Sequence, residues 1–207
     1  MRRAAILVTA LAFAPTAHAA PPAVSVQASP SSGAAPLQVT LTASGDLATY
    51  HWELGDGATA DGPVVQHAYP AGRFVARVTA TGPTGEATQA AVTVTSFGLT
   101  LAAPRIGRYG QRLRFHGRLV PGLKGVRVVL YRSGGRIAAV RTGRNGRFHV
   151  RGRVGTPDKQ YTVRANGAVS NAVTLAVRPG LDTAFRGSGQ LGHPLSLAVR
   201  ERPRMAT

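Results

Sequence analysis

The sequence predicts an all-β protein made of tandem antiparallel β-sandwiches. Segments in which apolar and polar residues alternate recur along the chain, and a period of two is typical of strands with one buried face. The 25 glycines and 14 prolines fall in short clusters between these segments, as turn residues do. No segment after the first twenty residues has a convincing 3.6-residue period, so the sequence predicts no helix there.

The first element in chain order is an export signal. Arg2 and Arg3 precede an apolar run over residues 4–15, and Ala17-His18-Ala19 has the small-residue spacing of a cleavage site. We expect a secretory signal peptide over residues 1–19 and a mature chain that starts at Ala20. An uncleaved membrane anchor is the alternative. The mature chain has no second apolar run that could span a membrane, so a secreted or extracellular, surface-associated protein is expected.

Residues 20–97 are predicted to form the first sandwich. Alternation predicts strands over residues 23–28, 37–43, 50–54, 74–81 and 87–95. Turn residues separate these segments, and their spacing of 10 to 15 residues favours a sandwich over a βαβ fold.

Two motifs lie in this unit. Trp52-Glu-Leu-Gly-Asp-Gly57 places a large apolar side chain before a turn, because glycine accepts positive φ angles. His67-Ala-Tyr69-Pro-Ala-Gly-Arg-Phe74 follows, and its two aromatic residues are expected in the core on either side of a second turn. His67 is expected to cap or pack against the turn beside Trp52, with a role at a contact surface as the alternative.

These two motifs resemble the signature of the polycystic kidney disease (PKD) domain. The resemblance implies a secreted β-sandwich used for adhesion, spacing and polymer contact, without catalytic activity of its own. It also implies that Trp52 lies inside the sandwich, whereas a sugar-stacking tryptophan would be exposed.

Residues 98–180 are predicted to form a second sandwich. Apolar residues alternate with basic ones over residues 112–119 and 147–154, and further strands are expected at 126–130 and 161–165. Asn145-Gly146 predicts a hairpin, because a type I′ turn needs positive φ at both central residues. This stretch resembles the Ig-like or transthyretin-like repeats of bacterial surface proteins.

The start of the second unit recurs further along the chain. Leu99, Gly107, Leu113 and Pro121 match Leu181, Gly189, Leu195 and Pro203 at a constant offset. Residues 181–207 are therefore expected to begin a further repeat. Two strands cannot bury a core, so this segment is expected to be marginal or disordered unless it docks.

The sequence offers no catalytic constellation. It has no cysteine, which removes disulfides, thiolate metal sites and cysteine nucleophiles. The histidines form no H-E-x-x-H pair, and no G-x-S-x-G elbow is present. A protein that is not an enzyme and has no cofactor is expected. Glu53, Asp56 and Asp61 could contribute to a calcium site, but Asp56 bonding its own turn is the preferred interpretation.

Basic charge is concentrated in the second unit. Seventeen of the 25 lysines and arginines lie in residues 98–180, where Asp158 is the only acidic residue. Residues i, i+2 and i+4 share one face of a strand, so the alternation predicts two basic stripes. If both strands belong to one sheet, they form a cationic plate. The candidate ligand-binding residues are Arg112, Arg114, Arg118, Arg147, Arg151 and Arg153, with His116 and His149 between them.

The expected partner of this plate is an anionic cell-envelope polysaccharide or another surface polymer, and a protein partner is possible. Specific nucleic-acid binding is not expected, because the stripes lack interleaved aromatic residues for base stacking. A monomer is expected. Lys124 and Lys159 are the only lysines, so GC-rich codon usage is an alternative source of the arginines.

Three functions remain open at this point. The chain could be a non-catalytic binding module, or a structural spacer without a ligand. It could also be the non-catalytic N-terminal region of a secreted cell-wall enzyme, such as an L,D-transpeptidase or a hydrolase, whose catalytic domain is absent from this chain.

Overall fold

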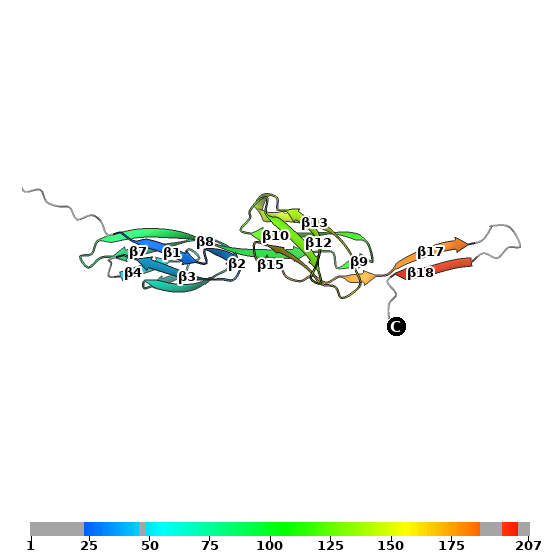
Figure 1. Cartoon of the computed structure of the whole chain (residues 1–207), viewed down its shortest axis with the longest axis horizontal. Helices are drawn as coiled ribbons and strands as arrows, with labels where there is room; N and C mark the ends of the chain where they lie inside the picture. Colours follow the sequence, from blue (N-terminus) through cyan, green and yellow to red (C-terminus); the bar gives the residue numbers. More distant parts are fainter. Residues whose placement is uncertain (1–22, 46–48, 187–195, 203–207) are drawn as a thin grey trace, which may run out of the picture.

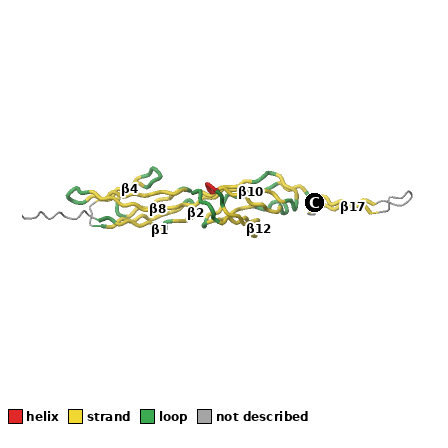
Figure 2. Tube along the Cα trace, turned by 90° about the horizontal axis from the view of Figure 1, so that it is seen from above, coloured by secondary structure: helices red, strands yellow, loops and turns green. Residues whose placement is uncertain are grey.

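The computed structural model describes residues 23–45, 49–186 and 196–202. Two sandwich units lie end to end along the long axis, and a two-stranded hairpin extends beyond the second unit (Figures 1 and 2). Within the described residues, helical structure is limited to one 3-10 turn, η1 (Arg144–Gly146). The predicted all-β class with antiparallel sheets is confirmed. The predicted signal peptide lies outside the described residues.

The first unit packs two sheets against each other. One sheet has the order β1-β3-β6, and the other contains β8, β7, β4 and β5 in that order. The strands are β1 (Ser25–Ser29), β2 (Ser32–Ala34), β3 (Leu37–Ser44), β4 (Thr49–Glu53), β5 (Thr59–Asp61), β6 (Val64–Tyr69), β7 (Gly72–Thr81) and β8 (Ala87–Ala102). Alternation along β3 buries Leu37, Val39, Leu41 and Ala43 against Trp52 and Val78 of the facing sheet.

The second unit has its own core between two further sheet layers. Its strands are β9 (Ile106–Arg108), β10 (Arg112–Val120), β11 (Arg127–Arg132), β12 (Gly135–Arg141), β13 (Arg147–Arg153), β14 (Tyr161–Ala165), β15 (Ala168–Val169) and β16 (Ala176–Arg178). One layer is formed by β8, β10 and β13, and the other has the order β12-β11-β14-β15. Phe115, Phe148 and Tyr161 are buried between the layers.

The two units share strand β8. Its residues 87–96 pair with β7, and its residues 98–102 pair with β10. The boundary expected between residues 97 and 98 therefore falls inside one continuous strand. β8 also continues past Thr95, where the alternation in the sequence predicts its end. Ser96 is buried at the junction and donates a hydrogen bond from Oγ to the Tyr69 carbonyl, at 3.1 Å.

The predicted hairpin at Asn145-Gly146 is wrong in its pairing, although its turn chemistry is confirmed. Asn145 (φ 56°) and Gly146 (φ 71°) both adopt positive φ, as the motif predicts. The strands on either side nevertheless pair with other partners, because β12 pairs with β11 and β13 pairs with β10. The turn instead passes the chain from one sheet layer to the other.

The C-terminal hairpin repeats the pairing of β8 with β10. Strands β17 (Gly180–Arg186) and β18 (Ser196–Arg202) pair with Gly180 opposite Arg202. In the second unit, Gly98 lies opposite Val120, and each pair of the β8–β10 ladder corresponds to a pair of the hairpin at the same offset. The recurrence in the sequence thus coincides with a recurrence of strand register. Residues 187–195 and 203–207 lie outside the described part of the chain.

Candidate anion-binding face

The candidate binding residues lie on one outer face of the second unit. Strands β10 and β13 are direct antiparallel neighbours, and along both strands exposed residues alternate with buried ones. The inward side chains, such as Phe115 and Val150, hold the strands on the core. The outward side chains form four rows across the two strands, which we call the cationic strip: Arg112–Arg153, Arg114–Arg151, His116–His149 and Arg118–Arg147.

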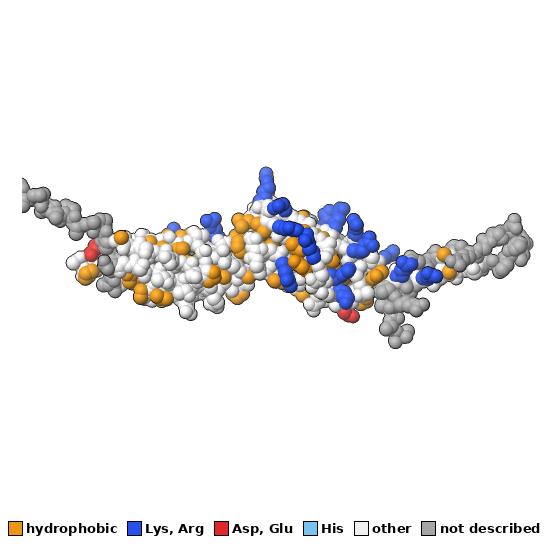
Figure 3. Space-filling view, viewed as in Figure 1, with side chains coloured by type: hydrophobic (Ala, Val, Ile, Leu, Met, Phe, Trp, Pro, Cys, Tyr) orange, Lys and Arg blue, Asp and Glu red, His pale blue; other side chains and the backbone are white. Residues whose placement is uncertain are grey.

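All six arginines expected at the site therefore share this face, in direct register. Like charges opposite each other on an antiparallel pair destabilise it by about 0.2–1 kcal/mol per pair. In the described part of the chain, both salt bridges are His–Asp contacts of the first unit, so no carboxylate neutralises a strip arginine. Figure 3 shows Lys and Arg side chains concentrated over the second unit, whereas the first unit displays few.

A shallow groove lies beside the His116–His149 and Arg118–Arg147 rows, at one end of the strip. Its volume is about 360 Å³. Thr100 and Ala102 of β8 are opposite Arg118 and His116, and their small side chains leave the space open. The rings of His116 and His149 are 6.3 Å apart between their centroids. The groove thus combines a small-residue floor with histidine and arginine walls.

A second hollow, of about 270 Å³, lies at the other end of the strip. Arg153, Arg132 and Lys159 line it, with Tyr109 and the backbone of Gly155. Arg132 comes from β11 and reaches across to donate a hydrogen bond from Nη1 to the Arg153 carbonyl, at 3.2 Å. Three cations from three separate segments therefore surround one cavity.

Sequence reasoning did not identify Arg132, Lys159 or Tyr109 as site residues. They lie outside the two alternating stripes, and only the closure of the sandwich places them beside Arg153. The single available signal was the general excess of basic residues in this unit.

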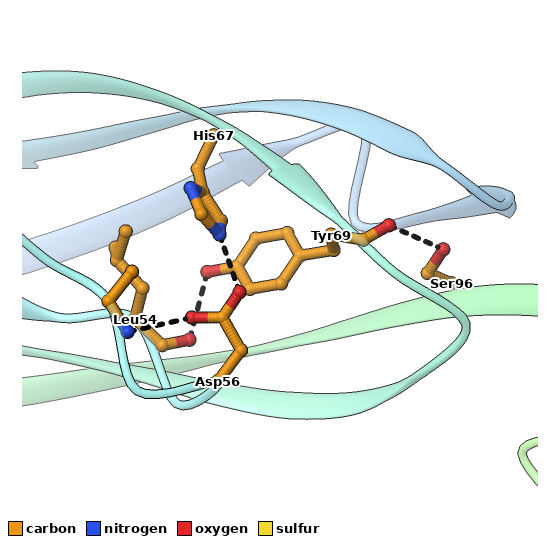
Figure 4. A network of polar contacts seen from close by, with 6 residues as sticks. Leu54, Asp56, His67, Tyr69 and Ser96 are labelled. Carbon is orange, nitrogen blue, oxygen red and sulfur yellow. Dashed lines mark hydrogen bonds and ion pairs between the residues drawn. The ribbon is translucent and has the colours of Figure 1, made fainter.

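The motif residues of the first unit build the core and a turn. Trp52 is fully buried and donates from Nε1 to the Gly62 carbonyl, at 3.0 Å. Tyr69 is also fully buried and donates from Oη to the Leu54 carbonyl (Figure 4). Phe74 stacks on Tyr69 and is partly buried. The predicted core positions of Trp52 and Tyr69 are confirmed, and Phe74 packs against the same core. Burial and the charge of Asp56 raise the pKa of Tyr69 to about 12, so its hydroxyl remains a donor.

Asp56 fixes the turn that follows Trp52. Its Oδ1 accepts a hydrogen bond from the Ala58 N–H at 3.1 Å, as predicted, and its Oδ2 lies 2.6 Å from His67 Nε2 (Figure 4). Burial acts to raise the pKa of Asp56, but the bonds from His67 and Ala58 and the charge of His67 outweigh it, so the pKa is lowered. The predicted packing of His67 against this turn is confirmed.

The calcium alternative gains no support from this region. Asp61 is bonded to His51 at 2.6 Å, separately from the Asp56 pair. Among the described residues, no group of three or more histidine or acidic side chains could hold a metal ion. No helix in the same part of the chain is long and apolar enough to cross a membrane.

Comparison with solved structures finds β-sandwich proteins of low sequence identity. Fibronectin(III)-like modules of Clostridium thermocellum CbhA are 14% identical, over 74% of this chain and 93% of theirs, with a TM-score of 0.30. A 1.5-MDa bacterial ice-binding adhesin is 16% identical, over 80% of this chain and 68% of its own, with a TM-score of 0.31. Carbohydrate-binding modules from the β-sandwich superfamily are 11% identical, over 76% and 93%, with a TM-score of 0.35.

No curated protein matches the chain. The family model of the PKD domain matches residues 23–95, the stretch that contains both motifs of the first unit. PKD domains are generally non-catalytic modules, which agrees with the structural roles of Trp52, Asp56 and Tyr69. Residues 23–95 of this chain are therefore similar to the PKD domain, and β8 leads directly from this first unit into the unit that carries the cationic strip.

Proposed function

We propose that this protein is a secreted, non-catalytic surface module that binds an anionic cell-envelope polymer through its cationic strip. The first unit acts as the spacer that positions the second unit. The observation that carries the proposal is the strip itself: three rows of paired arginines and one of paired histidines, in register and without acidic neighbours.

The energetics favour a polyanion as the ligand. Each arginine row faces water with its mutual repulsion uncompensated, and an anion placed between two guanidinium groups removes that repulsion. Arginine also presents a planar fork that bonds two oxygens of a phosphate or carboxylate at once. Binding should therefore be driven by charge and weakened by salt, because surface charges are screened within about 8 Å at 0.15 M ionic strength.

Co-sedimentation of the full chain with insoluble anionic cell-wall material tests this function. We expect binding at low salt and release at high salt. The double substitution Arg114→Glu/Arg151→Glu should abolish binding, because it reverses the charge of one row and leaves the buried residues intact.

Arg127 and Arg141 provide the matched control. They form a cross-strand arginine pair between β11 and β12, on the opposite sheet layer of the same unit, and both are exposed. The change Arg127→Glu/Arg141→Glu alters the net charge by the same amount as the strip substitution. Binding should nevertheless persist, because both residues lie outside the cationic strip. Absence of binding by the unmodified chain, or binding that ignores salt, would favour the spacer function instead.

A further inference from the structure

The spacing of the rows in the strip restricts the kind of polyanion that fits. Neighbouring rows are two residues apart along β10, and a strand rises about 3.3 Å per residue, so the rows repeat about every 6.6 Å. Four rows then span about 20 Å from the first to the last. The strip is thus a ladder of anion-binding positions with one fixed interval.

A linear polyol phosphate has a matching interval. A repeat of phosphorus, oxygen, three carbons and oxygen contains six backbone bonds. A polypeptide covers about 3.3–3.6 Å with three such bonds, so six extended bonds span about 7 Å. Inorganic polyphosphate has only two bonds per repeat, which corresponds to about 2.3 Å on the same scale, and places its charges far too densely for one charge per row.

The width of the strip also favours a slim chain. Directly opposed side chains start from Cβ atoms about 4.5–5.5 Å apart, so each arginine row can hold one phosphate between two cations, and the histidine row can hold one beside its ring N–H groups. An unbranched polyol backbone can run along the seam between β10 and β13 with its phosphates at the rows. Single-stranded nucleic acid has the same six-bond spacing, but β10 and β13 offer its bases no exposed Trp, Tyr or Phe on which to stack.

The two hollows extend this path at both ends. The groove beside His116 and Arg118 widens the strip at one end. The histidine row could donate ring N–H bonds to a phosphate that lies in this groove. The cavity lined by Arg132, Arg153 and Lys159 lies at the other end, where three cations converge. A phosphate at the end of the path would have more cationic neighbours there than at any single row.

We propose that the cationic strip is a track for a linear polyol phosphate, such as a poly(glycerol phosphate), with about four phosphates bound along β10 and β13 and one of them at the Arg132–Arg153–Lys159 cavity. This inference rests on the proposed function and specifies its ligand. The interval between rows sets the spacing of the bound phosphates, and Arg132 and Lys159 bind the phosphate at the end of the track.

The experiment is a calorimetric titration of the full chain with synthetic glycerol phosphate oligomers of two, four and eight phosphates. Affinity should rise steeply up to four phosphates and then level off. The slope of log K against log salt should be about −3 for the tetramer, since each phosphate contact on a single strand contributes about −0.7. An affinity that does not depend on oligomer length would overturn the inference.

Substitutions test the track row by row. Arg114→Gln/Arg151→Gln should weaken tetramer binding about tenfold and make the salt slope less steep by about 0.7, because one phosphate loses both partners. Arg132→Gln/Lys159→Gln should have a similar effect through the end cavity. Arg127→Gln/Arg141→Gln on the opposite layer should change neither quantity, and equal losses in all three variants would contradict a defined track. Melting curves identify any variant that fails to fold, and another of the three arginine rows, changed as Arg112→Gln/Arg153→Gln, then replaces it.

Competing polymers separate this inference from the proposed function. A polyuronate, inorganic polyphosphate or oligothymidylate that binds more tightly than the glycerol phosphate of equal charge would refute the polyol phosphate, while leaving a polyanion-binding strip in place. Failure of all four polymers to bind would refute both. Tightest binding of the glycerol phosphate, weakened about tenfold by Arg114→Gln/Arg151→Gln, supports both.

Discussion

At the scale of single residues, the Asp56 carboxylate links the turn after Trp52 to strand β6. Only 14% of its side chain is exposed, although the residue as a whole lies at the surface, and the carboxylate accepts bonds from Ala58 and His67. Its lowered pKa means that the folded state favours the ionised form. The stabilisation that follows is fully present above the pKa of the unfolded chain, near 3.9, and is lost as the pH falls through the lower folded value.

We therefore expect Asp56→Asn to destabilise the first unit at pH 7 by about 1–3 kcal/mol, the usual cost of disrupting a hydrogen bond to a charged group. The difference from the unmodified chain should shrink below about pH 4. Urea unfolding followed by the fluorescence of Trp52, the single tryptophan, measures this unit alone.

Asp61→Asn is the matched control for this prediction. Asp61 pairs with His51 at the same 2.6 Å, but its side chain is 81% exposed. Exposed ion pairs contribute little to stability, so the urea midpoint should barely move. An equal loss in both variants would mean that burial of Asp56 does not matter.

At the scale of elements, the turn η1 depends on close approach of backbone atoms. A Cβ on Gly146 would lie 2.2 Å from the Leu119 carbonyl oxygen, in addition to the strain of its positive φ. Gly134 also has positive φ, but nothing lies within 4 Å of its Cβ position. Substitution of Gly134 therefore tests the effect of backbone strain alone, whereas substitution of Gly146 adds a steric clash.

Gly134→Ala should cost about 1–2 kcal/mol of stability, the price of a left-handed conformation for a residue with a side chain. Gly146→Ala should cost more, because β10 and the turn must also move apart. Differential scanning calorimetry of the second unit measures both, with Trp52 fluorescence as the reference for the first unit. Equal costs would show that the contact with Leu119 is easily relieved.

Strand β8 pairs with β10 in the second unit, and at Leu101 a side chain satisfies the backbone groups that have no partner strand. Asn171 accepts a hydrogen bond from the Leu101 N–H and donates one to the Leu101 carbonyl, both at 2.9 Å. The amide thus satisfies both backbone groups of a buried residue. Asn171→Ala should destabilise the second unit by about 1–3 kcal/mol.

The same substitution should accelerate hydrogen exchange at the Leu101 amide more than at its neighbours on β8. Unchanged exchange at Leu101 would mean that another group replaces the asparagine. Asn171→Gln keeps the amide at the cost of one methylene and should restore part of the protection.

At the scale of the whole molecule, β8 should make the two units one rigid body. Its residues 96–98 pass from one core to the other without leaving strand conformation. Nuclear spin relaxation should therefore report a common rotational diffusion tensor for both units. Insertion of Gly-Ser-Gly-Ser between Phe97 and Gly98 should give each unit its own tensor. Independent tumbling of the unmodified chain would contradict a rigid junction.

The sequence predicted the faces of strands better than their partners. Alternation placed Phe115 and Val150 in the core and Arg114 and Arg151 outside, because a strand's two faces follow from its own residues. It could not show that β13 pairs with β10, since the local turn at Asn145-Gly146 predicts pairing with the preceding strand. Pairing depends on contacts between distant segments, which the local pattern does not contain.

The same distinction explains what was missed at the candidate site and at the junction. The stripes were visible because each lies on one strand, whereas Arg132 and Lys159 join them only through the folded sandwich. The sequence predicts that strand β8 ends at Thr95. In the structure, the strand continues and changes core just past that residue, and Ser96 bonds Tyr69 there.

The continuity of β8 also determines how the protein would carry tension. A pull along the long axis acts on a strand whose first part is bonded to β7 and whose last part is bonded to β10. These bonds lie across the pulling direction, so they are loaded together in shear and cannot open one after another like a zipper. A protein tethered at one end and holding a polymer at the other would therefore resist extension through the two ladders on either side of the point where its units meet.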